Sequence, residues 1–217
     1  APQTGTIASL GSGVDGRPVY GGTNSGGGNF FDILEIYNTS SGYQSNLSFQ
    51  LQRSVSRGLS INTAYTYGRA KDKNSVTSSQ AVSQMRFNPI SMDANAPALT
   101  TSNFEIRHRA FISLSYSHEF FRNAPTTVSL FYNGQSGRPY SFIVLNDLNN
   151  DGFDQNDLFY VPRNESEILL GSISSGKYVK ATAAGTTFSD LDAFIKNNEF
   201  LDDSRGKIFE RNSARNP

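Results

Sequence analysis

The stretch that decides the fold is Tyr43-Gln44-Ser45-Asn46-Leu47-Ser48-Phe49-Gln50-Leu51-Gln52. Tyr43, Leu47, Phe49 and Leu51 occupy odd-numbered positions, and every even-numbered position between them is polar. Successive side chains of a β-strand point to opposite faces of the sheet, so this period of two predicts a strand with one apolar and one polar face. The polar face carries Gln, Asn and Ser without Lys or Glu.

The same alternation recurs in three later segments, at residues 59–67, 107–118 and 126–135. Short links at residues 54–58 and 121–125 connect the four segments as two hairpins. Long connections follow the hairpins, at about residues 69–103 and 139–205, and the Gly-rich residues 1–29 read as another long loop. Short turns that alternate with long loops are typical of outer-membrane barrels, whose turns are periplasmic and whose loops are extracellular.

The pattern therefore predicts an all-β fold, in which antiparallel up-and-down strands form a sector of a transmembrane outer-membrane β-barrel with long extracellular loops. Tyr67, Tyr116 and Tyr132 lie near strand ends or upper strand bodies, where an aromatic girdle is expected. His108 and His118 share one side of a strand about 33 Å apart, so they cannot share a metal ion. We interpret His108 as a polar group at the strand end or in the lumen.

Composition supports this interpretation. Aromatic residues make up 12% of the 217 residues, but all hydrophobic residues only 36%, as expected for strands that are apolar on one side only. The sequence contains no run of about 18 apolar residues, so it predicts no transmembrane helix. Lys plus Arg and Asp plus Glu are balanced at 19 each, so we expect no nucleic-acid partner. The absence of cysteine excludes thiolate chemistry and disulfides.

A soluble antiparallel sandwich is the alternative, because its strands also alternate. Two features disfavour it. Loops of this length with little structure of their own are uncommon inside compact soluble domains, and the polar strand faces are rich in Gln, Asn, Ser and Thr rather than Lys and Glu.

The most chemical-looking motif is an acidic turn at residues 147–158. Asp147, Asn149 and Asp151 have the spacing of oxygen ligands that begins an EF-hand-like calcium loop, with Gly152 at the sharp turn. The twelfth position is Leu158 instead of Glu, while Asp157 lies one place early and Asp154 is an extra candidate. We take Asp147, Asn149, Asp151 and Asp157 as candidate calcium ligands, which would steady a loop and do no chemistry. The alternative is a solvated Asn/Asp turn.

Residues 189–196 predict a short loop helix, because Ser189 can cap an acidic first turn that precedes Phe194 and Ile195. The alternative is a small loop element that packs these two apolar side chains onto neighbouring loop residues. The sequence contains no nucleophile elbow, zinc-protease motif or phosphate loop, so we do not expect an enzyme.

Several short strings, in their order and spacing, resemble the C-terminal half of the barrel in TonB-dependent receptors of the Oar-like kind. They cover nearly everything from residue 42 to the end, and they are residues 42–47, 58–72, 107–109, 134–141, 147–152, 156–162, 205–207 and 210–217. The resemblance implies a large plugged barrel in a bacterial outer membrane that binds a substrate at extracellular loops and imports it with energy from TonB.

The chain departs from that family pattern, because it shows no plug domain, no TonB-contacting segment and no final aromatic-ended strand. We therefore expect residues 1–217 to be part of a barrel domain, with outer-membrane lipid, an unidentified transported substrate and, through the missing plug, TonB as partners. The alternative function is a secreted soluble β-protein that binds a glycan or a protein partner.

Overall fold

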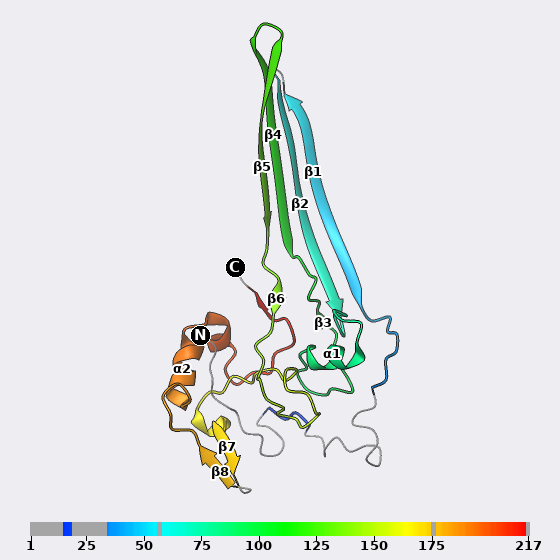
Figure 1. The fold of residues 1–217 in the computed structure, drawn as a ribbon. Coiled ribbons are helices and arrows are strands. Elements are labelled where there is room, and N and C mark those ends of the chain that lie inside the picture. Colours follow the sequence, from blue (N-terminus) through cyan, green and yellow to red (C-terminus); the bar gives the residue numbers. More distant parts are fainter. Residues whose placement is uncertain (1–14, 19–33, 56–57, 175–176, 216–217) are drawn as a thin grey trace.

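The computed structural model describes residues 15–18, 34–55, 58–174 and 177–215. Its main feature is an antiparallel sheet of four long strands, drawn as the tall shaft in Figure 1. The strands are β1 (Tyr43–Val55), β2 (Leu59–Asp72), β4 (His108–Phe121) and β5 (Ala124–Gln135), in the order β1-β2-β4-β5. Strand β3 (Thr100–Thr101) pairs with the end of β2. Every long strand pairs with its neighbour in sequence, as an up-and-down wall requires.

The strand register places most apolar side chains of the four strands on one face. One row across the sheet contains Leu51, Thr63, Ile112 and Tyr132, and the next apolar row toward the short turns contains Arg53, Ile61, Leu114 and Leu130. Because side chains alternate, the rows between them belong to the opposite face, which carries polar side chains such as those of Gln50, Asn62 and Ser115.

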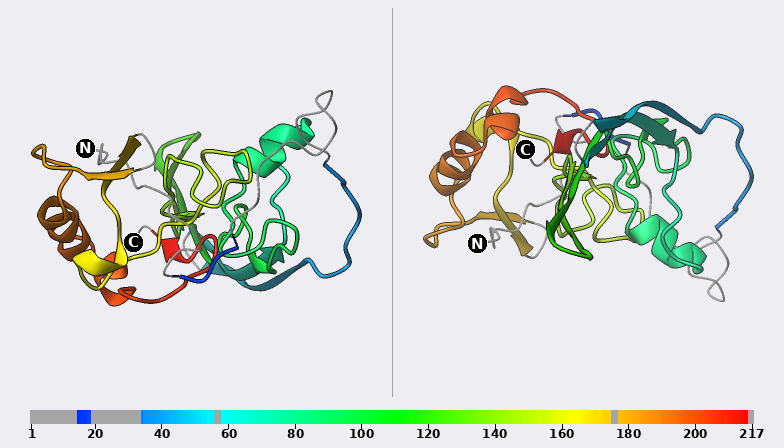
Figure 2. Two further views of the ribbon diagram at one scale, coloured as in Figure 1. Left: turned by 90° about the horizontal axis from the view of Figure 1, so that it is seen from below. Right: turned by 90° about the horizontal axis from the view of Figure 1, so that it is seen from above.

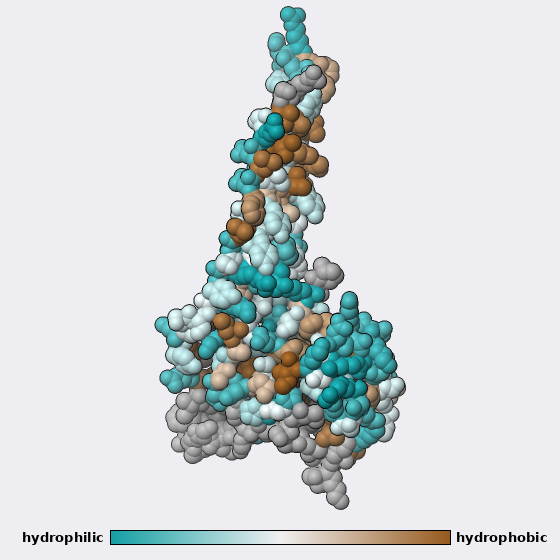
Figure 3. Space-filling view, turned by 180° about the vertical axis from the view of Figure 1, so that it is seen from behind, coloured by the Kyte–Doolittle hydropathy of each residue, from teal (hydrophilic) through white to brown (hydrophobic). Residues whose placement is uncertain are grey.

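The apolar face is open. Leu51 is 59% exposed, Phe49 63% and Leu130 65%, and in the part of the chain that the structure describes no second sheet packs on them. Figure 3 shows hydrophobic residues gathered along the shaft, between a hydrophilic tip and a hydrophilic band where the shaft joins the base. Soluble monomers rarely expose a continuous apolar surface of this kind, and strands of 12–14 residues are long enough to cross a bilayer at a tilt.

The opposite face is held by polar contacts between neighbouring strands. The Ser48 and Thr66 hydroxyls lie 2.9 Å apart, as do those of Ser115 and Ser129, and Thr127 donates to Ser117 at 3.1 Å. Phe111, which breaks the polar pattern in the sequence, meets Phe131 edge-to-face with ring centroids 5.1 Å apart. This face has the mixed polar character of a wet barrel lumen.

Both hairpin turns lie at one end of the sheet and both long connections at the other (Figure 1). The turn between β4 and β5 is tighter than predicted, since β4 continues to Phe121 and β5 begins at Ala124. Asn123 takes the left-handed conformation there with a φ of 65°, and its amide donates to Glu119 Oε1 at 2.6 Å. Strand β2 also continues past residue 69 to Asp72, because Lys71 and Asp72 pair with β1 or β3.

The long connections are not structureless, contrary to expectation. Smaller elements fill the base of the molecule, which extends to both sides of the sheet when seen along the strands (Figure 2). They are α1 (Ala81–Arg86), β6 (Pro139–Tyr140), the short 3-10 helix η1 (Glu165–Glu167), β7 (Gly171–Ser174), β8 (Lys177–Lys180), α2 (Phe188–Lys196), α3 (Glu199–Asp203) and β9 (Ala214–Arg215). The loop predicted at residues 1–29 falls mostly outside the described residues.

A hydrophobic core explains why the segment after β5 folds. Val161, Ile195 and Leu201 are fully buried, and Val144 and Phe159 complete the cluster. Phe142, Phe200 and Phe209 pack around it with successive ring contacts at 6.1 and 5.5 Å. We call this folded region, residues 139–215, the loop body.

The predicted loop helix is confirmed as α2, and it also packs its apolar side chains into the loop body. Ile195 is buried at the core, with Phe194 against it. The cap differs from the prediction: Thr187, instead of Ser189, forms a reciprocal capping box with Asp190. Among the described residues, no helix is both long and apolar enough to span a membrane.

Candidate functional site

The acidic turn lies in the loop body and is closed by its own backbone. Asp147 accepts hydrogen bonds from the amides of Asp151 at 3.1 Å and Gly152 at 2.9 Å. Asp151 accepts from the Phe153 amide at 2.9 Å and from the Asn149 and Asn156 side chains at 3.2 and 2.8 Å. Gly152 has a φ of 89°, which is the left-handed turn that the motif predicts.

Asp157 joins this turn to a distant segment. Its Oδ2 accepts from the Leu148 amide at 2.7 Å, and its Oδ1 accepts from Arg17 Nη1 at 2.8 Å. The Arg17 guanidinium also donates to the Leu158 carbonyl at 2.6 Å and to Asp15 at 2.8 Å. Both Arg17 and Asp157 are buried, so the pair fixes the turn from inside the loop body.

The carboxylates of the turn repel one another. Burial raises the pKa of Asp157 to about 6, against the opposing effects of the Leu148 amide and Arg17, and the charges of Asp151 and Asp147 raise it further. Burial is also the main cause of the raised pKa of Asp147, to which Asp151 adds. The structure therefore brings the four predicted calcium ligands into one turn in which negative charge is only partly compensated.

The arrangement does not itself form a metal cage. No group of three or more His, Asp or Glu side chains in the described part of the chain is arranged to hold a metal ion. The amides that bind Asp147 and Asp151 leave lone pairs free, since each carboxylate can accept about four hydrogen bonds or ligand bonds. Calcium binding stays a prediction from the sequence.

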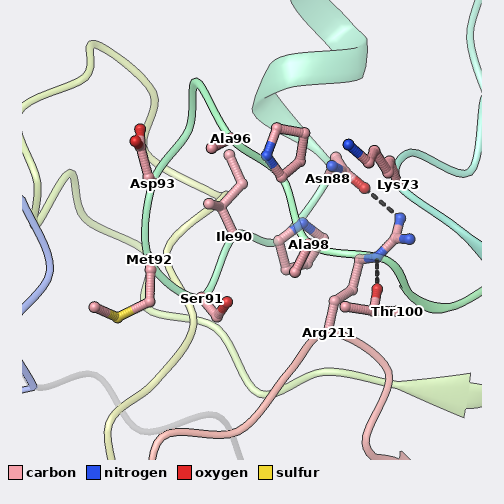
Figure 4. Close-up of a pocket in the computed structure, with 12 residues that line it drawn as sticks. Lys73, Asn88, Ile90, Ser91, Met92, Asp93, Ala96, Ala98, Thr100 and Arg211 are labelled. Atoms are coloured by element: carbon pink, nitrogen blue, oxygen red, sulfur yellow. Dashed lines mark hydrogen bonds between the residues drawn. The ribbon is translucent and has the colours of Figure 1, made fainter. Parts of the chain in front are cut away.

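Arg211 is the centre of a second cluster, between the loop body and the connection after β2. Its guanidinium donates to Thr100 Oγ1 at 3.0 Å, to the Asp72 carbonyl at 3.0 Å, and to the Asn88 side chain and the Asp72 carboxylate. Arg211 is only 3% exposed. Figure 4 shows its contacts with Asn88 and Thr100 at the wall of a pocket.

This pocket has a volume of about 150 Å³. Its wall combines the charged Lys73, Asp93 and Arg211 with apolar side chains such as those of Ile90 and Met92 (Figure 4). Half of the lining residues are polar or charged, and the volume suits one group of a ligand, because pockets that enclose a drug-sized molecule typically measure about 300–1,000 Å³. Apart from Arg211, all residues that line the pocket come from the first of the two loop regions that the sequence singled out, residues 69–103.

The sequence predicts His108 to be a polar group at the strand end or in the lumen. The structure places it at the strand end, and the register puts it on the apolar face instead of the lumen face. His108 pairs with Tyr67 in the apolar rows, at the loop end of β4, and its Nδ1 lies 2.7 Å from the Tyr65 hydroxyl. It therefore contributes with Tyr65 and Tyr67 to an aromatic group on the apolar face.

Sequence reasoning missed Arg17, Glu105 and Arg211, all buried charged residues. Each has a partner far away in sequence, and 140 positions separate Arg17 from Asp157. The one signal available was the position of Arg211 in a string that resembles the receptor family.

The sheet, with one apolar and one polar face and with all long connections at one end, has the architecture of a transmembrane barrel wall. Comparison with known families agrees: the model of the outer membrane beta barrel domain matches residues 2–217. The chain belongs to this family. No curated protein and no solved structure matches the chain.

Family membership settles location and the fold class. The protein is an outer-membrane protein, and its four long strands are a sector of the barrel wall. The apolar face is therefore the lipid side and the polar face the lumen side. A secreted soluble protein is set aside, because its apolar strand face would remain in water.

Proposed function

We propose that this chain is part of a TonB-dependent outer-membrane receptor of the Oar-like kind, which binds a substrate at its extracellular loops and imports it. Transport, rather than catalysis, is the role that we assign to it. The resemblance of the ordered strings from residue 42 to the end supports this finer assignment, and the barrel family is consistent with it.

The observation that carries the proposal is the joining of the two long connections. Arg211 of the loop body is held by Asp72, the last residue of β2, and by Asn88 and Thr100 of the connection between β2 and β4. A simple diffusion pore would not require such a buried network at one end of its strands. A receptor does, because a substrate site must be held in a fixed geometry above the lumen.

On this proposal the end of the sheet with the loop body faces outward, and the end with the two tight turns faces the periplasm. The pocket between Lys73, Met92 and Arg211 is where we expect substrate contact. TonB would act through a plug domain of the parent protein.

The test uses the full-length gene product. It is refolded in a nonionic detergent, and heat-modifiable gel mobility establishes that the barrel is folded. The purified periplasmic domain of TonB is then offered to it in a pull-down, with a folded porin as control. Capture by the gene product and not by the porin is expected. If the folded product fails to capture TonB, the receptor proposal is wrong, although the barrel remains.

A further inference from the structure

Three charged side chains meet where the loop end of the sheet joins the loop body, and the charge of a fourth, Arg69, acts on them. Glu105 precedes β4 by three positions, Arg107 by one, Arg69 lies near the end of β2, and Arg215 comes from β9. The guanidinium groups of Arg107 and Arg215 bind the Glu105 carboxylate. The Arg69 guanidinium instead donates to the Tyr67 hydroxyl at 2.7 Å. It acts on Glu105 and Arg215 through its charge.

Both carboxylate oxygens of Glu105 accept hydrogen bonds from the protein. Its Oε2 accepts from the Ala70 amide at 2.9 Å, and its Oε1 accepts from Arg107 Nη2 at 3.2 Å and from Arg215 Nη2. Its side chain is 1% exposed. The carboxylate thus balances one positive charge, and the cluster keeps a net charge of about +2, because arginine stays protonated in proteins.

Two of the donors have no partner. Arg107 Nε and Arg215 Nη1 are both buried, and neither makes a hydrogen bond. Buried donors without partners are costly, most of all on charged groups. The pKa of Arg215 also shows that positive charge is in excess here. Burial lowers this pKa most, the charge of Arg107 lowers it next, and the charge of Arg69 adds to the effect.

The missing partner has a defined chemistry. Guanidinium groups bind carboxylate and phosphate oxygens through charge-assisted hydrogen bonds, often two at a time. The cluster opens to solvent through the exposed parts of two side chains, 29% of that of Arg107 and 19% of that of Arg215. Such an opening suits a small anion or the anionic end of a small molecule rather than a protein surface.

We propose that Arg69, Arg107 and Arg215 form a binding site for a small soluble oxyanion, a phosphate or carboxylate group, with Glu105 holding two of the three guanidinium groups in place. The site is separate from the pocket beside Arg211. It does not depend on the proposed receptor function, since any outer-membrane barrel with these residues would carry it.

The experiment uses the full-length protein, refolded in a nonionic detergent so that it carries no bacterial lipid. Inorganic phosphate and, separately, acetate are titrated in at constant ionic strength with chloride, and binding is followed by calorimetry. Saturable binding of at least one probe is expected. The two titrations distinguish a phosphate site from a carboxylate site.

The variants test the location and the sign of the charge. We expect Arg215→Gln to weaken binding about tenfold, since a hydrogen bond to a charged group is lost. The exposed Arg69→Gln is expected to weaken binding without disturbing the hydrogen bonds of Glu105, and Arg69→Glu, which reverses the charge, is expected to weaken it more. A merely structural role of Arg69 would not order the variants by charge.

Arg163→Gln is the matched control, because it removes one positive charge from an exposed residue of the loop body that pairs with Glu167. Its affinity should equal that of the wild type. The proposal is overturned if neither probe binds saturably, or if Arg69→Gln binds as tightly as the Arg163→Gln control.

Discussion

Arg211 and Asp72 are in contact across 139 positions of sequence, and the contact is twofold: the guanidinium binds both the backbone carbonyl and the carboxylate of Asp72. Asp72 is the last residue of β2. The rim of the barrel wall and the loop body are therefore joined through a buried arginine at the point where the strand ends.

Replacing Arg211 with alanine should loosen the loop body and leave the wall intact. The change removes the charged partner of Asp72, whose carboxylate keeps only the hydrogen bond from Ser75 among the described residues, and it removes the donor to Asn88 and Thr100. We expect a local loss of about 3 kcal/mol. Limited proteolysis of the full-length protein should show faster cleavage after β2, with unchanged heat-modifiable mobility. Arg163→Ala, at an exposed arginine, is the control. Equal cleavage of the two variants would contradict the anchoring role.

The acidic turn should lose stability as pH rises. Burial raises the pKa of Asp157 to about 6, whereas a carboxyl in the unfolded chain titrates near 4. The folded turn therefore binds the proton more tightly, so the stability that protonation contributes is complete below about pH 4 and is lost through pH 6. The loss is about 3 kcal/mol at most.

Hydrogen exchange of residues 147–158, corrected for intrinsic rates, measures this effect. Exchange through local opening should quicken between pH 4 and pH 7 in the wild type. Asp157→Asn should flatten the dependence, because the amide does not titrate. A wild-type profile that is equally flat would show that Asp157 is not the group responsible.

The wall of the barrel could be predicted from sequence because its signal is local. Each strand has a period of two, and the faces assigned to Leu47, Phe49, Ile112 and Leu130 are those that the register shows. Strand ends were less well placed: β2 continues to Asp72 since its last pairs are with β1 and β3, which the alternation of β2 alone does not encode.

The loop body and its charged clusters could not be predicted in the same way. Its core joins Val144 and Val161 to Ile195 and Leu201, residues separated by long stretches with mixed patterns. The turn at Asp147 was visible because its contacts are local, but Arg17, the buried partner of Asp157, lies 140 positions earlier. Only α2 carried a helical signal, and even there the cap is Thr187, two positions before the residue predicted.

Calcium should stabilise the acidic turn if the sequence-based prediction is correct. An ion would offset the repulsion among Asp147, Asp151 and Asp157 and lower the pKa of Asp157. In the full-length protein at pH 7, calcium should therefore slow proteolysis of the loop relative to chelator, and Asp147→Asn should abolish the effect. Asp190→Asn, in the α2 capping box, is a control elsewhere in the loop body. Identical cleavage with calcium and with chelator would reject calcium binding.

The two faces of one strand provide the sharpest test of the wall. Leu51 lies on the apolar face of β1, and its neighbour Gln52 lies on the polar face, so the two positions share a depth and differ in surroundings. Arginine at a lipid-facing position near the bilayer midplane costs about 2–4 kcal/mol, whereas arginine toward the lumen stays solvated. We therefore expect Leu51→Arg to lower the midpoint of urea unfolding of the full-length protein in liposomes, and Gln52→Arg to leave it nearly unchanged. If Gln52→Arg were instead the more damaging change, the lipid and lumen faces would have to be exchanged, because the strand alternation admits only these two assignments.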